Sequence, residues 1–420
     1  MGRSGLHVLA INSGSSSLKF GLFGVRGGKV TPCATGEAQA IGSSAGLLRV
    51  RDGHGGDVLH EETVPIADGV QAFSRVARLL AGMDVPPADA IGHRIVHGGA
   101  QLRAHARIDA TVMAQLEAAS AFAPLHVPAA LTVVRAAQAR FPALPQVACL
   151  DTAFHAHLPE EARTLPLDRP LQAAGVQRYG FHGLSCASIL AQWPQAPARL
   201  VIAHLGSGAS ITAVREGRSV DTSMGMTPSG GVMMATRSGD LDPGVLAWLA
   251  REKGMDAVAL ERLVDHRSGL LGVSGISGDL RQLRKVERAE PSARLAIAMF
   301  ALSVRKQIAA MAAVLQGIDA LVFTGGIGEH DAQARAEICA GLAWAGIRLD
   351  PARNQGGGPR IGLDGAACDV RVMPSEEERQ ICRYVHDLLR DEEVRREEDA
   401  ALPPHPPGRR EPRSRSGSHP

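Results

Sequence analysis

Residues 199–244 read RLVIAHLGSGASITAVREGRSVDTSMGMTPSGGVMMATRSGDLDPG, and much of the architecture can be predicted from this segment. Residues 200–203 and 211–214 are short apolar runs bounded by turn residues, as is typical of buried strands. The turn between them consists of small residues, namely Gly206, Ser207 and Gly208. Backbone N–H groups in such a turn can converge on an anion. The segment therefore predicts a β-hairpin that binds a phosphate-sized group.

A similar arrangement occurs near the amino terminus. Residues 6–12 and 20–25 are β-like runs, and the turn between them, residues 13–19, is rich in serine and ends in Lys19. Taken alone, this turn could equally be an ordinary loop. Two such hairpins predict a duplicated fold with the ligand held between its halves.

The remaining pattern predicts an α/β protein. Residues 26–65 alternate in the manner of a strand meander, and residues 292–316 have the apolar spacing of a long helix. Further strands are expected at residues 146–150, 320–323 and 370–373. The chain has 420 residues, which favours two domains over one core.

Composition excludes several classes of protein. The chain has 45 basic and 43 acidic residues, so we expect no nucleic-acid or membrane-surface partner. Its six cysteines form no CxxC pair and have no metal-ligand spacing, which favours reduced thiols in the cytoplasm. We find neither a signal-peptide pattern nor an apolar run of about 18 residues.

Two arginines lie in unusual sequence contexts. Arg237 follows a glycine- and methionine-rich loop, which suits a guanidinium that grips a phosphate or carboxylate. Arg94 lies inside an apolar run that ends in two glycines. A buried arginine needs an anionic partner, which could be a substrate or a structural carboxylate.

Other candidates follow predicted strands or open predicted helices. Asp151 ends the strand at residues 146–150, where α/β folds place functional groups, although it could instead cap a helix. His182 lies between Phe181 and Gly183 and could be either structural or a hydrogen-bond donor to an anion. A double glycine after the strand at residues 320–323 would bring backbone close to a nucleotide.

Together these residues are the components of phosphoryl transfer, which depends on positioning and charge neutralisation. The Walker A pattern GxxxxGK[ST] is absent from the sequence. A carboxylate acceptor is already ionised at neutral pH, so it needs cations to approach a nucleotide rather than a general base. Arg94 and Arg237 would meet that need. An ATP-binding switch or scaffold is the alternative from another class.

The chain closely resembles the acetate kinases of the acetate and sugar kinase, chaperone and actin superfamily. The resemblance runs from about residue 8 to residue 389. Its motifs are INSGSSSLKFGLF, GHRIVHGG, FAPLHVP, DTAFH, YGFHG, HLGSGASITAV, DTSMGMTP, MMATRSGDLDP, SGLLGVSGIS, FTGGIGE and PSEEE.

The resemblance implies a two-domain, duplicated ribonuclease-H-like (actin-like ATPase) fold with the active site in the interdomain cleft. We expect domains at residues 1–150 and 151–377, with a helix at about residues 378–390 completing the first, and a disordered tail at residues 391–420. It also implies a homodimer and reversible, Mg²⁺-dependent (or Mn²⁺-dependent) transfer of the γ-phosphoryl group of ATP to acetate. Propionate is the alternative acceptor.

The resemblance further implies roles for individual residues. The catalytic residues would be Asp151, Arg237, His182 and Arg94. The acyl substrate would contact Arg94 and an apolar pocket made by Val96, Leu125, Phe181 and Pro228. The nucleotide would contact Lys19, His204, Gly206, Ser207, Gly208, Asp279, Arg281, Gly326, Ile327 and Gly328. The metal would bind near Asn12 and Glu377. By analogy, Val96 favours acetate over propionate.

Some positions depart from the family pattern. Ser207, His330 and Glu376 each replace an asparagine. These departures leave open whether ATP, GTP or pyrophosphate is the phosphoryl donor, and which residue of the glutamate run binds the metal.

Overall fold

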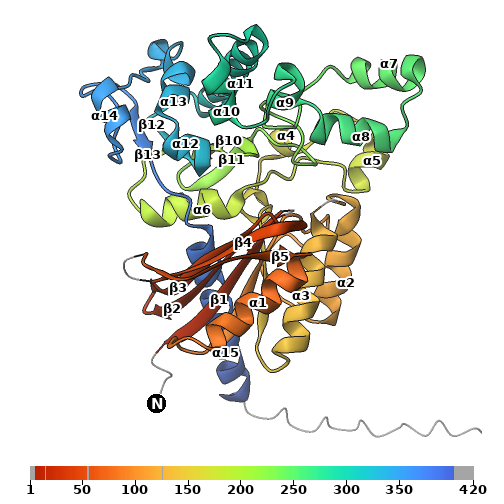
Figure 1. Ribbon diagram of the computed structural model, residues 1–420, viewed down its shortest axis with the longest axis vertical. Coiled ribbons are helices and arrows are strands. Elements are labelled where there is room, and N and C mark those ends of the chain that lie inside the picture. The colour runs from red at the N-terminus through yellow and green to blue at the C-terminus, as the bar shows by residue number, and fades with distance from the viewer. Residues whose placement is uncertain (1–4, 15, 54–55, 125, 402–420) are drawn as a thin grey trace, which may run out of the picture.

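The computed structural model describes residues 5–14, 16–53, 56–124 and 126–401, with side chains up to residue 395. Figure 1 shows two halves, each built on a β-sheet, with helix α6 (Gly183–Gln192) between them. The first sheet lies in the lower half of that view and the second in the upper half.

The first sheet has eight strands in the order β5-β4-β3-β2-β1-β6-β8-β7. The first five strands form an antiparallel meander, as the alternation of residues 26–65 predicts. The strands are β1 (Leu6–Ser13), β2 (Ser17–Arg26), β3 (Lys29–Gln39), β4 (Ser43–Asp52), β5 (Val58–Ile66), β6 (Ala90–Ile95), β7 (Ala106–Arg107) and β8 (Gln146–Leu150).

The second sheet has five strands in the order β11-β10-β9-β12-β13. They are β9 (Arg199–Leu205), β10 (Ala209–Arg215), β11 (Arg218–Thr222), β12 (Ala320–Thr324) and β13 (Asp369–Val372). Strands β9 and β10 are the predicted hairpin. The next hairpin turns at Glu216 and Gly217, whose φ angles of 50° and 76° are those of a tight left-handed turn.

The two sheets repeat one topology. In the first, β3 and β2 pair antiparallel, β2 and β1 antiparallel, β1 and β6 parallel, and β6 and β8 parallel. In the second, the successive pairs in the order β11-β10-β9-β12-β13 have the same directions. The prediction of a duplicated fold is therefore confirmed.

Helices cover both faces of the first sheet. Helices α1 (Gly69–Ala81) and α3 (Val127–Arg140) pack on one face, and α15 (Glu377–Ala401) packs on the other, against β1, β2 and β6. The contact with β6 is close at Gly92, where a Cβ atom would lie 2.3 Å from Cγ2 of Ile381. This position therefore requires glycine.

Helix α11 (Pro291–Leu315) forms the centre of the second core. Its buried side, with Phe300, Val304 and Ile308, packs against β9 and β10. By length and composition this helix could cross a membrane, although Arg305 and Lys306 interrupt its apolar run and a core helix passes the same test. On its other side Leu295, Met299 and Leu302 are exposed.

Shorter helices connect these elements. They are α2 (Ala110–Ala118), α4 (Glu160–Arg163), α5 (Arg169–Ala173), α7 (Pro243–Lys253), α8 (Ala257–His266), α9 (Gly269–Ser274), α10 (Leu280–Val286), α12 (Gly325–His330), α13 (Ala332–Cys339) and α14 (Pro351–Gly356). The 3₁₀ turns are η1 (Ala119–Ala121), η2 (Ala153–His155) and η3 (Ala343–Ala345).

The carboxyl-terminal helix corrects one prediction. We expected disorder from residue 391, but α15 continues to Ala401. Glutamate, arginine and alanine dominate residues 391–401 and have high helix propensity, so a helix already anchored on the sheet can propagate through them without an apolar face. The rest of the predicted tail, residues 402–420, lies outside the described residues.

Candidate active site

Two glycine turns meet at the carboxyl end of the second sheet. Strands β9 and β12 run parallel, so the turns that follow them lie at the same edge. A Cβ atom on Gly206 would lie 3.9 Å from the backbone nitrogen of Gly326 and 3.9 Å from Nε2 of His204. Three of the predicted nucleotide-binding residues therefore lie together.

Arg237 and His182 converge beside the first of these turns. A Cβ atom on Gly208 would lie 3.3 Å from both Nη1 of Arg237 and Nε2 of His182. Glycine at this position leaves room for a group that both side chains could contact. The guanidinium is held weakly, since Nη1 donates to the carbonyl of Pro228 at 3.4 Å.

His182 is held in a sparsely populated backbone conformation. Its φ and ψ angles of 57° and 26° are left-handed, which is uncommon for a residue other than glycine. Its Nδ1 bonds to Oγ of Ser210 at 3.0 Å, and its ring stacks on that of His204 at 4.1 Å. Burial and the cations around it, including Arg94 and Arg237, lower the pKa of His182 well below its usual value, so it is neutral.

The arginine of β6 forms a buried ion pair. Nε and Nη2 of Arg94 both donate to Oδ2 of Asp151, at 2.9 and 2.5 Å. Asp151 is fully buried, and burial raises its pKa to about 6 against the opposing effect of Arg94. The other carboxylate oxygen, Oδ1, is buried with no hydrogen-bond partner among the described residues. Arg94 thus has a structural carboxylate partner and also borders the candidate site.

An amide connects this ion pair to the start of α15. Nη1 of Arg94 donates to Oδ1 of Asn12 at 3.2 Å, and Nδ2 of Asn12 donates to Glu377 and to Glu378, each at 2.9 Å. Burial raises the pKa of Glu377, but the combined effect of Arg94, His204, Asn12 and Lys19 is larger and lowers it. Burial and the charge of Glu377 raise the pKa of Glu378. Two adjacent carboxylates therefore face the same small space.

This donor set fits a magnesium ion held partly by substrate. Among the described residues no group of three or more His, Cys, Asp or Glu side chains could hold a metal. Mg²⁺, however, usually binds one or two carboxylates together with waters and substrate phosphates. Carboxylate oxygens of Glu377 and Glu378 and the unpartnered Oδ1 of Asp151 are suitable hard donors. Asn12 differs, because its Oδ1 is engaged by Arg94.

A chain of hydroxyl groups connects the same carboxylate to His204. Nδ1 of His204 bonds to Oγ of Ser185 at 2.8 Å, Ser185 to Ser375 at 3.1 Å, and Ser375 donates to Oε1 of Glu377 at 3.4 Å. Sequence reasoning missed both serines. Ser375 lies inside the motif PSEEE and Ser185 lies two residues after YGFHG, but serine is too common for either to be singled out.

His126 is a third residue that sequence reasoning missed. Nη2 of Arg237 donates to Nε2 of His126 at 3.3 Å. Arginine can only donate, so this ring nitrogen must be unprotonated. Burial and the charges of Arg237 and Arg94 lower the pKa of His126 to about 4, in agreement with that tautomer.

The predicted apolar pocket is partly assembled. Val96 and Phe181 are buried in one hydrophobic cluster, and the Phe181 ring lies edge-on to that of His97 at 5.5 Å. The carbonyl of Pro228 contacts Arg237 as described above. Leu125 lies outside the described residues.

The other predicted nucleotide contacts lie around the glycine turns. The Ala235 N–H donates to the carbonyl of Ser207 at 3.4 Å, and Gly278 packs on Ala235. Asp279 and Arg281 come one and three residues after Gly278, so their segment begins beside the turn at Ser207. Asp279 caps α10 and pairs with Arg281 at 2.8 Å. The last two predicted residues, Ile327 and Gly328, lie in α12.

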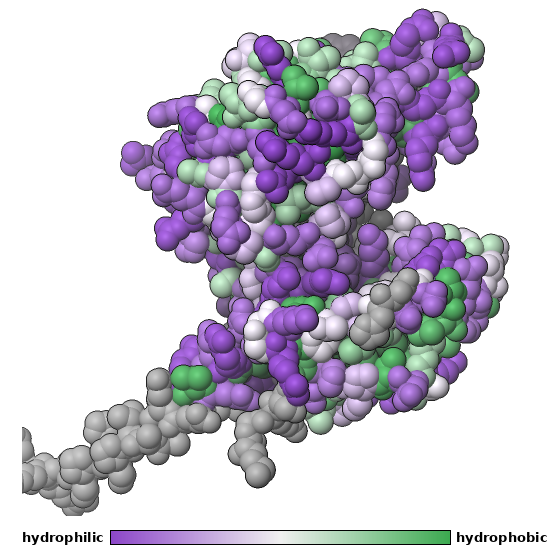
Figure 2. Space-filling model, turned by 90° about the vertical axis from the view of Figure 1, so that its left-hand side faces the viewer, coloured by the Kyte–Doolittle hydropathy of each residue, from purple (hydrophilic) through white to green (hydrophobic). Residues whose placement is uncertain are grey.

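Lys19 lies across the β1–β2 hairpin from Asn12. It is close enough to Glu377 to contribute to the lowering of that carboxyl's pKa. Figure 2 shows the surface indented between the two halves, with mostly hydrophilic walls. Residues of both sheets thus contribute charge to one site. The proximity of the two arginines is also evident in the pKa of Arg237, which burial and the charge of Arg94 lower against the opposing effect of Asp265.

Comparisons with known proteins point to one family. Residues 7–383 match the acetokinase family. The chain is 43% identical to the acetate kinase of Leifsonia xyli over 392 residues, covering 90% of this chain and 97% of that protein. It is 40% identical to the propionate kinase of Citrobacter rodentium, covering 90% and 96%.

Solved structures agree with this match. A crystal structure of Porphyromonas gingivalis acetate kinase superposes with a TM-score of 0.80 at 34% identity, covering 91% of this chain and all of that one. A propionate kinase from Francisella tularensis superposes with a TM-score of 0.82 at 32% identity, covering 90% and 98%. The predicted duplicated, actin-like ATPase fold is therefore confirmed.

Proposed function

Because this chain belongs to the acetokinase family, we propose that it transfers the γ-phosphoryl group of ATP reversibly to acetate, giving acetyl phosphate and ADP. The observation that carries this proposal is the convergence of Arg237 and His182 beside Gly208, close to the ion-paired Arg94. Cations placed there would let an ionised carboxylate approach a polyphosphate.

The two arginines and His182 would then each have a distinct task. The weakly held guanidinium of Arg237 is available to bind the equatorial oxygens of the transferring phosphoryl group. Arg94, oriented by Asp151, would hold the acetate, and neutral His182 would donate a hydrogen bond from Nε2. Nothing in this arrangement requires a general base, because the acceptor is already an anion.

We propose that Glu377, with Glu378 beside it, holds Mg²⁺ together with the nucleotide phosphates. When bound, this ion would neutralise charge on the β- and γ-phosphates. Asn12 would orient the two carboxylates. The turns at Gly206 and Gly326 would hold the nucleotide, with Lys19 and His204 near its phosphates and Asp279 and Arg281 near the adenosine.

The test is to trap the acyl phosphate with hydroxylamine. With MgATP and acetate, we expect an acyl hydroxamate and ADP in equal amounts. ADP released at the same rate without acetate, and no hydroxamate, would instead identify an ATP-hydrolysing switch. Propionate is the second candidate substrate, because propionate kinases are among the relatives.

The side chain at position 96 should influence the choice between these two acids. Val96→Ala removes two methylene-sized groups from the proposed pocket, so kcat/KM for propionate relative to acetate should rise about tenfold. Val220→Ala is the matched control, because Val220 packs against the same hydrophobic cluster and is not part of the proposed pocket. An equal change in both variants would mean that Val96 does not contact the acyl group.

We propose a homodimer that covers the exposed apolar face of α11. Leu295, Met299 and Leu302 share one side of the helix and are 54%, 41% and 49% exposed. Leu302→Glu should convert the dimer to monomers in sedimentation experiments. Val394→Glu, at a valine of α15 that is 46% exposed, should not. A Leu302→Glu protein that stays dimeric would place the interface elsewhere.

The domain boundaries and location are also proposals. We divide the chain into residues 1–150, completed by α15, and residues 151–377, which contain the second sheet. All six cysteines are unpaired, which supports a cytoplasmic location.

A further inference from the structure

A cavity of about 850 Å³ lies at the other end of the second sheet. Arg199, one of its lining residues, is the first residue of β9, and Ile318 lies two residues before β12. The candidate active site follows the last residues of the same strands. The length of β9, seven residues, separates the two places by about 20 Å. The cavity shares no lining residue with the candidate active site.

The size and walls of this cavity suit a small flat molecule. Sites for small ligands typically enclose about 300–1,000 Å³. Nine of its sixteen lining residues are glycine or alanine, so the walls are largely backbone and short side chains. Such walls leave room for a ring to lie against them.

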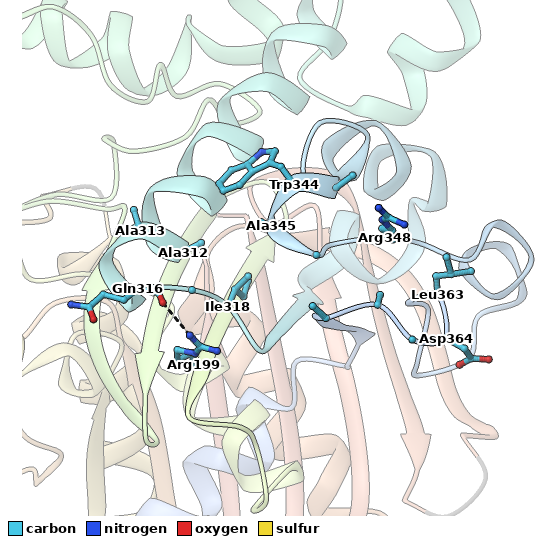
Figure 3. A pocket seen from close by; sticks show the side chains of 16 residues that line it. Arg199, Ala312, Ala313, Gln316, Ile318, Trp344, Ala345, Arg348, Leu363 and Asp364 are labelled. Atoms are coloured by element: carbon cyan, nitrogen blue, oxygen red, sulfur yellow. Dashed lines mark hydrogen bonds between the residues drawn. The ribbon is translucent and has the colours of Figure 1, made fainter.

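Trp344 supplies an aromatic surface that other side chains leave open. It lies in the turn η3 and is 72% exposed, compared with 45% for Trp248. Both Trp344 and Arg348 line the cavity, and Figure 3 shows Arg348 to the right of the indole. An indole face left open in this way can stack on another flat ring.

The cavity also contains a guanidinium without a partner. Arg348 is exposed and makes no side-chain hydrogen bond or ion pair with the described residues. The carboxylate in the lining, Asp364, is already neutralised by two hydrogen bonds from Arg353, at 2.8 and 2.5 Å. The balance of charge therefore favours an anion.

The carbonyl groups at the end of α11 do not offset this positive charge. Nη1 of Arg199 donates to the carbonyl of Gln316 at 3.0 Å, and Nη2 of Arg215 donates to that of Val314 at 2.9 Å. These contacts satisfy carbonyls whose partial charge would otherwise repel an anion. Arg199 itself is paired with Asp319, so Arg348 remains the available cation in the lining.

We propose that this cavity is a second ligand site for a planar aromatic molecule that carries an anionic group, of which a nucleoside monophosphate is one example. The ring would stack on Trp344 and the anion would pair with Arg348 in the bidentate manner of guanidinium groups. The proposal does not depend on the assigned reaction, because it uses none of the candidate active-site residues.

The test is a titration of the full-length chain with AMP, in which binding is measured by the quenching of tryptophan fluorescence. AMP should quench the tryptophan fluorescence of the wild-type protein. It should also quench that of Trp248→Leu, the matched control, because Trp248 lies on α7 outside the cavity. It should not quench Trp344→Leu, and Arg348→Gln should raise the dissociation constant for AMP at least about tenfold. Adenosine and inorganic phosphate, which each lack one half of the ligand, should bind at least about tenfold more weakly than AMP. Benzoate, which lacks the indole fluorophore, distinguishes an aromatic carboxylate from a nucleotide: tighter binding of benzoate than of AMP would identify an aromatic carboxylate as the preferred source, and weaker binding a nucleotide.

Any of the following results would overturn the proposal. The first is quenching by AMP that persists in Trp344→Leu, because the ring would then bind elsewhere. The second is an unchanged affinity in Arg348→Gln, or no quenching of the wild type by millimolar AMP. The third is dissociation of Trp344→Leu into smaller species during sedimentation, which would show that a second copy of the chain covers the indole.

Discussion

Replacement of Arg237 by alanine is expected to lower kcat by about two to three orders of magnitude, as loss of one transition-state charge donor does in other enzymes. The guanidinium points at the space beside Gly208 that His182 also faces, where a transferring phosphoryl group would lie. Its two hydrogen bonds to described residues, to Pro228 and His126, are long, at 3.4 and 3.3 Å. Stability should therefore change little, because the side chain contributes few strong interactions to the fold.

Steady-state kinetics with acetate and MgATP, together with urea unfolding, check this prediction. Arg237→Lys is the matched variant. It retains the charge but loses the planar fork, so its kcat should fall between those of the wild type and the alanine variant. A kcat for Arg237→Ala within about threefold of the wild-type value would remove this residue from the mechanism.

Replacement of Asp151 by asparagine is expected to cost about 3–5 kcal/mol of unfolding free energy, and activity with it. The substitution preserves shape but leaves the positive charge of Arg94 without its buried carboxylate partner. An arginine cannot give up its proton to relieve that cost. Because Arg94 would also shift, kcat/KM for acetate should fall.

The reverse variant, Arg94→Met, should behave differently with pH. Its orphaned carboxyl can take up a proton, and burial already raises the pKa of Asp151 to about 6 with the arginine present. Without Arg94 this pKa rises further, so the folded state binds a proton that the unfolded state, with a pKa near 3.9, does not. The stability of Arg94→Met should therefore fall as pH rises from about 4 to the new pKa and level off above it, where neither state holds the proton.

Urea unfolding at pH 5.5 and pH 8 measures both effects. Asp319→Asn is the control, because Asp319 also forms a bidentate pair, with Arg199, but at the surface. An exposed pair of that kind is worth at most about 1 kcal/mol. If Asp151→Asn costs no more than Asp319→Asn, the buried ion pair does not support the site.

Much of the architecture was predictable because each local pattern agreed with the next. Apolar runs with small-residue turns predicted the β1–β2 and β9–β10 hairpins, and their recurrence predicted the repeated sheet order. For Arg94 the sequence left a substrate role and a structural ion pair open. The structure shows the ion pair, in a place where the side chain could also meet a substrate.

What the sequence did not predict depends on contacts between distant segments. Ser185 and Ser375 are separated by 190 positions, yet they bond at 3.1 Å between His204 and Glu377. Neither residue type has a periodicity or spacing that indicates such a contact. The exposed indole of Trp344 was missed for a similar reason, because a single aromatic residue does not show whether anything covers it.

The histidines around the two arginines have one further consequence. Burial and neighbouring charge hold the pKa of His126 at about 4 and that of His182 well below its ordinary value, so both rings remain uncharged from mild acidity to mild alkalinity. The guanidinium groups of Arg94 and Arg237 keep their positive charge over that interval. A phosphoryl-transferring enzyme with this site would therefore still attract its anionic substrates when weak organic acids accumulate and acidify its surroundings.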